Sequence, residues 1–137
     1  MITHTIDASA LLGYYLESSP GAVQQIPLLL NQLKTKNLHL ISTAFLDLEF
    51  ANGLRFSLKN QKVAELIFSK YLKLPIQKIP LTSKLSQESL RLSYQNQTTV
   101  YNSAYHILAL SRDATFLTCD QDYYRKTSHL GSIKLLT

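Results

Sequence analysis

The sequence has 137 residues, 45% of them hydrophobic and 17% charged, which suits one folded domain and excludes a disordered chain. Its 14 Lys and Arg against 9 Asp and Glu give a net charge of +5, which favours an anionic partner such as nucleic acid. The single cysteine, Cys119, excludes an internal disulfide and a cysteine-rich zinc site. With no signal-peptide pattern and no apolar run long enough for a bilayer, we expect a soluble, cytoplasmic, single-domain protein (1–137) without a membrane partner.

Short apolar segments that predict strands alternate with amphipathic segments that predict helices. The expected strands are 2–6, 38–41, 76–79, 115–118 and 133–136. The expected helices are 8–16, 22–36, a third ending near 58, then 61–73, 82–94, 99–112 and 121–126. Ser42 or Thr43 is expected to cap the third helix. This alternation predicts an α/β fold with a parallel five-stranded sheet and helices on both faces.

Two of the few acidic residues directly follow predicted strands. Asp7 comes after the first strand, and Asp120 follows the fourth with only Cys119 between. Ligands of parallel sheets bind beyond the carboxyl ends of the strands, where the strand order reverses. Both positions also precede helices, and Asp is a favoured N-cap. Position alone therefore leaves two explanations open, of which helix capping is the commoner.

A third acid, Glu49, lies in an otherwise largely apolar helix. Its carboxylate is either on a narrow exposed stripe or held inward for a chemical reason. Asp47 lies about 200° further around the same helix, so the two acids cannot face one site. We expect Asp47 to be a solvated surface residue.

Two further polar residues lie in predicted first turns of helices. Asn102 can act there as a cap, or its amide oxygen can bind a hard cation without adding charge. Asp122 follows Asp120 by two residues, where the helix dipole favours an acid in any case. We treat both as additional candidates beside the three acids.

Other catalytic chemistries find no support in the sequence. It contains neither a phosphate-binding glycine motif nor a nucleophile elbow. Its four histidines are dispersed without metal-ligand spacing. A receiver-type signalling domain would need an acid after the third strand, and Ile79-Pro80-Leu81-Thr82 has none.

Taken in order, four segments resemble the PIN-domain family, especially the VapC-type toxins of toxin–antitoxin pairs. The resemblance covers nearly the whole chain. The segments are Ile6-Asp7-Ala8-Ser9-Ala10-Leu11, Leu48-Glu49-Phe50-Ala51-Asn52-Gly53-Leu54-Arg55, Val100-Tyr101-Asn102-Ser103-Ala104-Tyr105-His106-Ile107-Leu108-Ala109 and Phe116-Leu117-Thr118-Cys119-Asp120.

This resemblance implies a three-layer α/β/α PIN-like fold and a metal-dependent endoribonuclease that hydrolyses RNA phosphodiester bonds. It also implies a homodimer and a cognate antitoxin protein as partner. Mg²⁺ or Mn²⁺ would be the cofactor, held by Asp7, Glu49 and Asp120, with Asn102 and Asp122 as further candidate ligands. The catalytic set would be Asp7, Glu49, Asn102 and Asp120.

Asn102 departs from the family pattern, which usually has Asp at this place. The site would then carry three negative charges instead of four, which should weaken divalent-cation binding. Two outcomes follow: an enzyme that works with three carboxylates and an amide, or a degenerate protein that binds RNA or a protein partner without cleaving.

Basic and aromatic residues near these segments are candidate RNA contacts. The alternative for each basic residue is an ordinary solvated surface, and for each tyrosine a packing role. The candidates for phosphate contact are Arg55, Lys59, Lys62, Arg125 and Lys126, and those for base stacking are Tyr14, Tyr15, Tyr105, Tyr123 and Tyr124.

Overall fold

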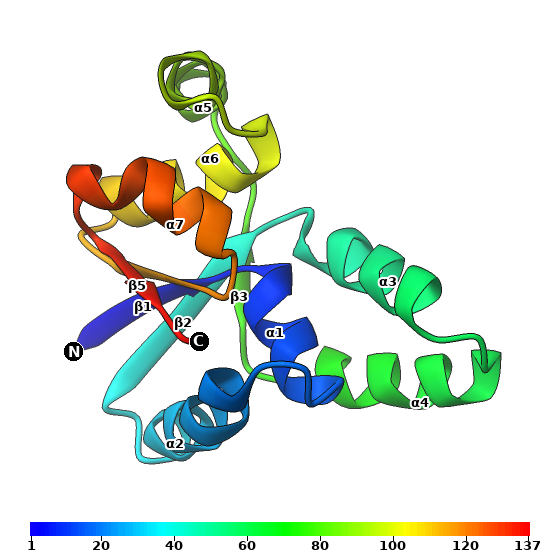
Figure 1. Cartoon of the computed structure of the whole chain (residues 1–137). Coiled ribbons are helices and arrows are strands. Elements are labelled where there is room, and N and C mark those ends of the chain that lie inside the picture. The colour runs from blue at the N-terminus through cyan, green and yellow to red at the C-terminus, as the bar shows by residue number, and fades with distance from the viewer.

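The computed structural model describes all residues, 1–137, and contains one five-stranded sheet (Figure 1). All neighbouring strands are parallel and follow the order β3-β2-β1-β4-β5. The predicted α/β class and parallel sheet are therefore confirmed. The strands are β1 (Ile2–Ile6), β2 (Leu38–Thr43), β3 (Gln77–Ile79), β4 (Thr115–Thr118) and β5 (Ile133–Leu135).

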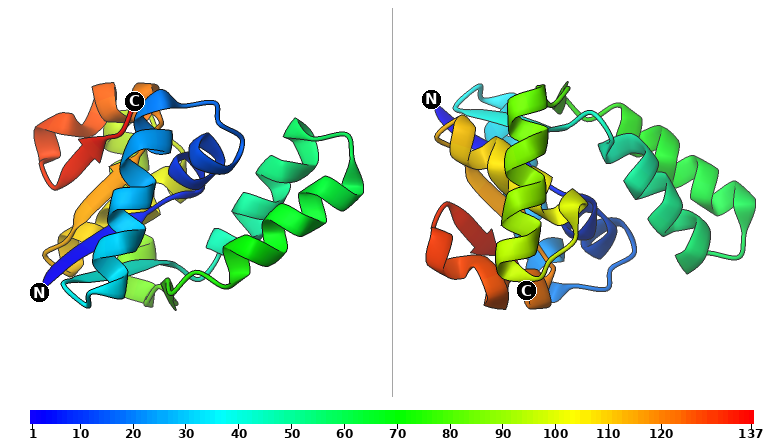
Figure 2. Two further views of the ribbon diagram at one scale, coloured as in Figure 1. Left: turned by 90° about the horizontal axis from the view of Figure 1, so that it is seen from below. Right: turned by 90° about the horizontal axis from the view of Figure 1, so that it is seen from above.

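Helices cover both faces of the sheet, as Figure 2 shows from opposite sides. Helices α1 (Ala8–Tyr15) and α2 (Pro20–Lys34) pack on one face. On the other face lie α6 (Val100–Ser111) and α7 (Gln121–Thr127), with α5 (Ser83–Asn96) packed on α6 and a short 3₁₀ turn, η1 (Ser128–Leu130), after α7. No helix combines the length and the apolar character needed to cross a membrane.

Helices α3 (Leu46–Ser57) and α4 (Gln61–Leu72) form a hairpin that projects sideways from the layered body (Figure 1). Aromatic packing joins the two helices of the hairpin, and Tyr15 of α1 packs edge-on against Phe50 of α3, with ring centroids 5.7 Å apart. The rings of Phe50 and Tyr71, both fully buried, stack with centroids 4.3 Å apart, and Phe68 stacks on Tyr71 at 5.7 Å. Aromatic pairs of this kind contribute beyond their buried area, so they stabilise the packing of α3 on α4.

The predicted cap of the third helix is wrong. Strand β2 runs on through Ser42 and Thr43, and α3 begins at Leu46 with Phe45 as N-cap and no side-chain capping bond. Ser42 Oγ instead donates a 2.5 Å hydrogen bond to the carbonyl of Ile6 in β1. Both residues are fully buried and pair with β3, so sheet formation outweighs the capping preference of a hydroxyl side chain.

The strand order reverses next to β1. The chain adds β2 and β3 on one side of β1, then returns to place β4 on the other side. Strands β1 and β4 pair in register, with Ile6 opposite Leu117. Residues that follow these two strands therefore meet at the switch point, where parallel sheets bind their ligands.

Candidate active site

Asp7 is the most deeply buried acid of the switch point, with 2% of its surface exposed. It caps α1: Oδ1 accepts the N–H of Ala10 at 3.0 Å and the hydroxyl of Ser9 at 2.7 Å. Oδ2 accepts the hydroxyl of Thr118 in β4 at 2.6 Å. Burial raises the pKa of Asp7 to about 6 against these hydrogen bonds, and the negative charge of Glu49 adds to the rise.

Asp120 repeats this arrangement at the end of the neighbouring strand. Oδ1 accepts the N–H of Tyr123 at 2.9 Å and so caps α7. Oδ2 accepts the side-chain amide of Asn102, from α6, at 3.1 Å. The capping explanation is therefore correct for one oxygen of Asp7 and of Asp120, while the second oxygen of each bonds a residue from another element.

Glu49 reaches the same region from the first turn of α3. Its Oε1 accepts the phenolic hydroxyl of Tyr105 at 2.8 Å, and partial burial raises the pKa of Glu49. Tyr105 is fully buried, and its pKa is raised by burial and then by the negative charges of Glu49 and Asp7. Glu49 is thus held inward by a defined partner, which decides between its two predicted roles.

Asn102 lies in the first turn of α6, where Thr99 is the N-cap and accepts the N–H of Asn102 at 3.1 Å. Its amide nitrogen donates to Asp120, so Asn102 acts here as a hydrogen-bond donor. A neutral donor offsets the charge of Asp120 where a carboxylate would repel it.

Hard oxygen donors at a shared sheet edge are the chemistry that Mg²⁺ and Mn²⁺ prefer. In this arrangement, however, no three His, Cys, Asp or Glu side chains lie close enough together to hold a metal ion. Asp7, Glu49 and Asp120 each have a hydrogen-bond partner instead. The oxygen donors are of the type that a divalent cation prefers, and a cation shared by the three carboxylates would require them to move closer together than they are here.

Asp122 and Lys126 line a surface pocket together with Asn102 and Asp120, next to the switch point. Asp122 is exposed on α7, where its carboxylate pairs with Arg125 at 2.5 Å and with Lys126 at 3.2 Å. These contacts, with the hydrogen bond from Lys126 first, lower the pKa of Asp122. Asp122, a candidate metal ligand, therefore forms surface salt bridges with Arg125 and Lys126, which are candidate RNA contacts.

Three expectations about single side chains need correction. Asp47 is not simply solvated: it accepts the hydroxyl of Tyr71 at 2.6 Å and pairs with Lys78 at 3.4 Å. Tyr105 and Tyr123 cannot stack on RNA bases, because both are buried in the core. Large aromatic side chains gain most from burial, which explains the packing role.

Two residues of the site were not singled out from the sequence, Ser9 and Thr118. Ser9 Oγ donates to Asp7 and accepts the N–H of Cys119 at 2.9 Å. Thr118 donates to Asp7 and accepts the N–H of Asp120 at 3.1 Å. Each lies two positions from an aspartate at a strand end. This spacing could have predicted their role, since Ser and Thr side chains often bond nearby backbone groups and carboxylates.

No protein-family model matches the sequence. No curated protein matches it by sequence either. Solved structures do match its fold. A chain of the VapBC2 structure from Rickettsia felis, bound to a DNA fragment from their promoter, gives a TM-score of 0.67 at 14% identity, over 98% of this chain and 97% of the other. PAE2754 from Pyrobaculum aerophilum gives a TM-score of 0.66 at 21% identity, over 96% of this chain and 83% of the other. A chain of a toxin–antitoxin complex from Klebsiella pneumoniae gives a TM-score of 0.67 at 10% identity, over 98% of each chain.

Proposed function

We propose that this chain, which has the PIN-domain fold of VapC-like proteins, is the toxin of a toxin–antitoxin pair and a Mg²⁺- or Mn²⁺-dependent endoribonuclease. The observation that carries the proposal is the meeting of Asp7 and Asp120 at the switch point between β1 and β4. The proposal includes a cognate antitoxin protein and a second copy of the chain as partners, as the resemblance implies.

Asp7, Glu49 and Asp120 would hold the cation, and the side chain of Asn102 would be a further candidate ligand of the same cation. A divalent cation, when bound, supplies a water of lowered pKa and neutralises charge on the phosphoryl oxygens. It also reverses the negative potential that the three carboxylates present to RNA.

The protein's own residues position these groups and move a proton. Ser9 and Thr118 hold the carboxylate of Asp7 in one orientation, which reduces the reorganisation needed when substrate binds. Glu49 is half-buried with a raised pKa, and Tyr105 bonds only one of its two carboxylate oxygens. It is therefore the acid we assign to accept a proton from the attacking water.

A second candidate function is RNA or protein binding without cleavage, and the Asn102–Asp120 hydrogen bond favours it. The Asn102 amide already donates a hydrogen bond to the Asp120 carboxylate, so the free energy that this carboxylate gains by binding a cation is smaller. Asn102→Asp decides between the two: cleavage that appears only in this variant identifies the parent as a binding protein.

The test incubates the purified full chain with several RNAs, with Mg²⁺, with Mn²⁺ and with a chelator. We expect metal-dependent cleavage that is lost in Asp7→Asn and in Glu49→Gln. Asp47→Asn is the matched control, because Asp47 lies on α3 but bonds Tyr71 and Lys78 instead of the site. Absence of cleavage above the Asp7→Asn level with every RNA contradicts the nuclease.

A further inference from the structure

Three side chains of α3 form a stripe that leads from the candidate active site towards the tip of the α3–α4 hairpin. Glu49, Asn52 and Phe56 are spaced three and four residues apart, which places them on one side of the helix. Glu49 and Phe56 differ by about 20° around the helix axis and by about 10 Å along it. The stripe begins at the site and ends on the outer half of the hairpin.

The outer members of this stripe have no partner that would bury them in the protein. Phe56 is 79% exposed, and the exposed side chain of Asn52 forms no hydrogen bond within the chain. A single exposed apolar residue is ordinary on a protein surface. Phe56 differs from such a residue because its ring and the free amide of Asn52 lie on the same side of α3 as the active-site carboxylate of Glu49.

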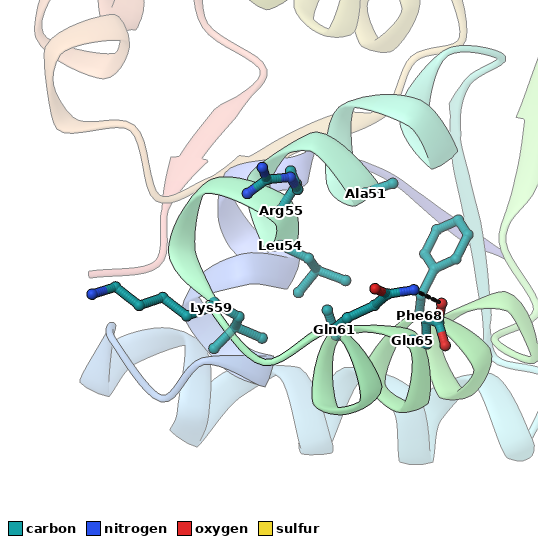
Figure 3. Close-up of a pocket in the computed structure, with 9 residues that line it drawn as sticks. Ala51, Leu54, Arg55, Lys59, Gln61, Glu65 and Phe68 are labelled. Atoms are coloured by element: carbon teal, nitrogen blue, oxygen red, sulfur yellow. Dashed lines mark hydrogen bonds between the residues drawn. The ribbon is translucent and has the colours of Figure 1, made fainter.

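Three cations lie on the outer half of the hairpin, towards which the stripe leads. Arg55, Lys59 and Lys62 are exposed, and none pairs with an acid. The Arg55 guanidinium lies 5.7 Å from the centroid of the Phe56 ring. Figure 3 shows Arg55 and Lys59 extending outward from the groove between α3 and α4, while Leu54 lies within it.

We propose that the outer half of α3 is a subsite for single-stranded RNA, with Phe56 as a stacking platform for an unpaired base next to the cleaved nucleotide. Asn52 would bond the edge of that base, and Arg55, Lys59 and Lys62 would neutralise the flanking phosphates. This subsite rests on the proposed function, since that function places the cleaved bond at Glu49.

The chemistry of the stripe favours RNA over a protein partner. Exposed aromatic rings interleaved with unpaired cations are what single-stranded nucleic acids bind. The groove of about 530 Å³ between α3 and α4 is lined by apolar residues such as Leu54, Leu58 and Phe68 and also by Arg55, Lys59, Gln61 and Glu65. Leu54 lies about 160° from Phe56 around the helix, so the Phe56 ring lies outside the groove, which does not include it, while Arg55 and Lys59 lie between the two.

The first test measures RNA binding by fluorescence anisotropy in an Asp7→Asn background, so that the RNA stays intact. Phe56→Ala should weaken binding of a mixed-sequence single strand by about tenfold and leave binding of the matching duplex unchanged. Tyr94→Ala is the control, because Tyr94 is 81% exposed on α5. Equal binding by Phe56→Ala and its parent overturns the subsite.

The second test measures how RNA affinity depends on salt. Replacing Lys59 and Lys62 by Ala should reduce the slope of log affinity against log salt by about 1.4, since each single-strand phosphate contact contributes about 0.7. The control replaces Lys34 and Lys36, exposed at the end of α2, and should keep the slope. An equal slope in parent and hairpin variant overturns the phosphate contacts.

These measurements separate the subsite from the nuclease. A chain that cuts RNA but binds it equally well with and without Phe56 disproves the subsite and keeps the function. If no RNA is cut but Phe56→Ala weakens single-strand binding, the nuclease fails and the RNA surface stands. If Phe56→Ala weakens binding of a co-purified protein partner and not of RNA, the stripe is a protein-docking surface and the subsite is wrong.

Discussion

Thr118 Oγ1 donates a 2.6 Å hydrogen bond to Asp7 Oδ2, across 111 positions of the sequence. The same oxygen accepts the N–H of Asp120 at 3.1 Å. One hydroxyl therefore joins the carboxylate of Asp7 to the backbone of Asp120 at the switch point. Its role can be tested separately from catalysis.

Thr118→Val keeps the shape of the side chain and removes the hydrogen bonds of its hydroxyl with Asp7, Asp120 and Ser9. We expect the free energy of unfolding to fall by about 1–3 kcal/mol, because a buried carboxylate loses a donor. The pKa of Asp7, measured by NMR titration, should rise above its present value. Thr115→Val in the same strand has no side-chain hydrogen bond to lose, and a comparable loss there would contradict the assignment.

The pH dependence of stability follows from the raised pKa of Asp7. Its carboxyl titrates near 3.8 without the protein environment and near 6 in the folded chain. The folded state therefore binds more protons between these values, so its stability falls as pH rises from about 4 to 6, by a contribution on the order of 3 kcal/mol. This contribution concerns the chain without metal.

Asp7→Asn removes that titration. Without metal, we expect the variant to match the parent near pH 4 and to be the more stable protein near pH 7, as measured by urea unfolding with a chelator present. An Asn amide can still accept from Ala10 and donate to Thr118. A variant less stable than the parent at neutral pH would show that Asp7 is stabilised more by its hydrogen bonds than it is destabilised by burial.

Asn102→Asp replaces the donor to Asp120 by a like charge. Without metal, the free energy of unfolding should fall by about 1–3 kcal/mol, since a hydrogen bond to a charged group is lost and repulsion is added. Mn²⁺ should raise the melting temperature of this variant more than that of the parent. Asn31→Asp on the exposed surface of α2 carries the same charge change and should leave both quantities unaltered.

Two tyrosines provide a matched pair on the carboxylates of α3. Tyr105 donates to Glu49 at 2.8 Å, and Tyr71 donates to Asp47 at 2.6 Å. Each Tyr→Phe change should cost about 1–2 kcal/mol of stability. Only Tyr105→Phe should also change RNA cleavage, because Glu49 loses its orientation. Equal cleavage by both variants would place Glu49 outside the reaction.

Local pattern was sufficient for most of the fold and for the position of the acids. Strand β1 and the start of α1 follow directly from the apolar run 2–6 and the capping preference of Asp7. The alternation of strands and helices fixed the parallel sheet, and with it the shared edge of Asp7 and Asp120. These features depend on residues close in sequence, whose interactions repeat with the period of the helix or strand.

Partners distant in sequence were decided only by the tertiary structure. Ser42 and Thr43 continue β2 instead of capping α3, Asp47 bonds Tyr71, and Tyr105 turns inward to Glu49. The second oxygens of Asp7 and Asp120 find Thr118 and Asn102 in other elements. Such contacts arise when packed layers bring remote segments together, and a buried polar group must then bond whatever donor the packing supplies.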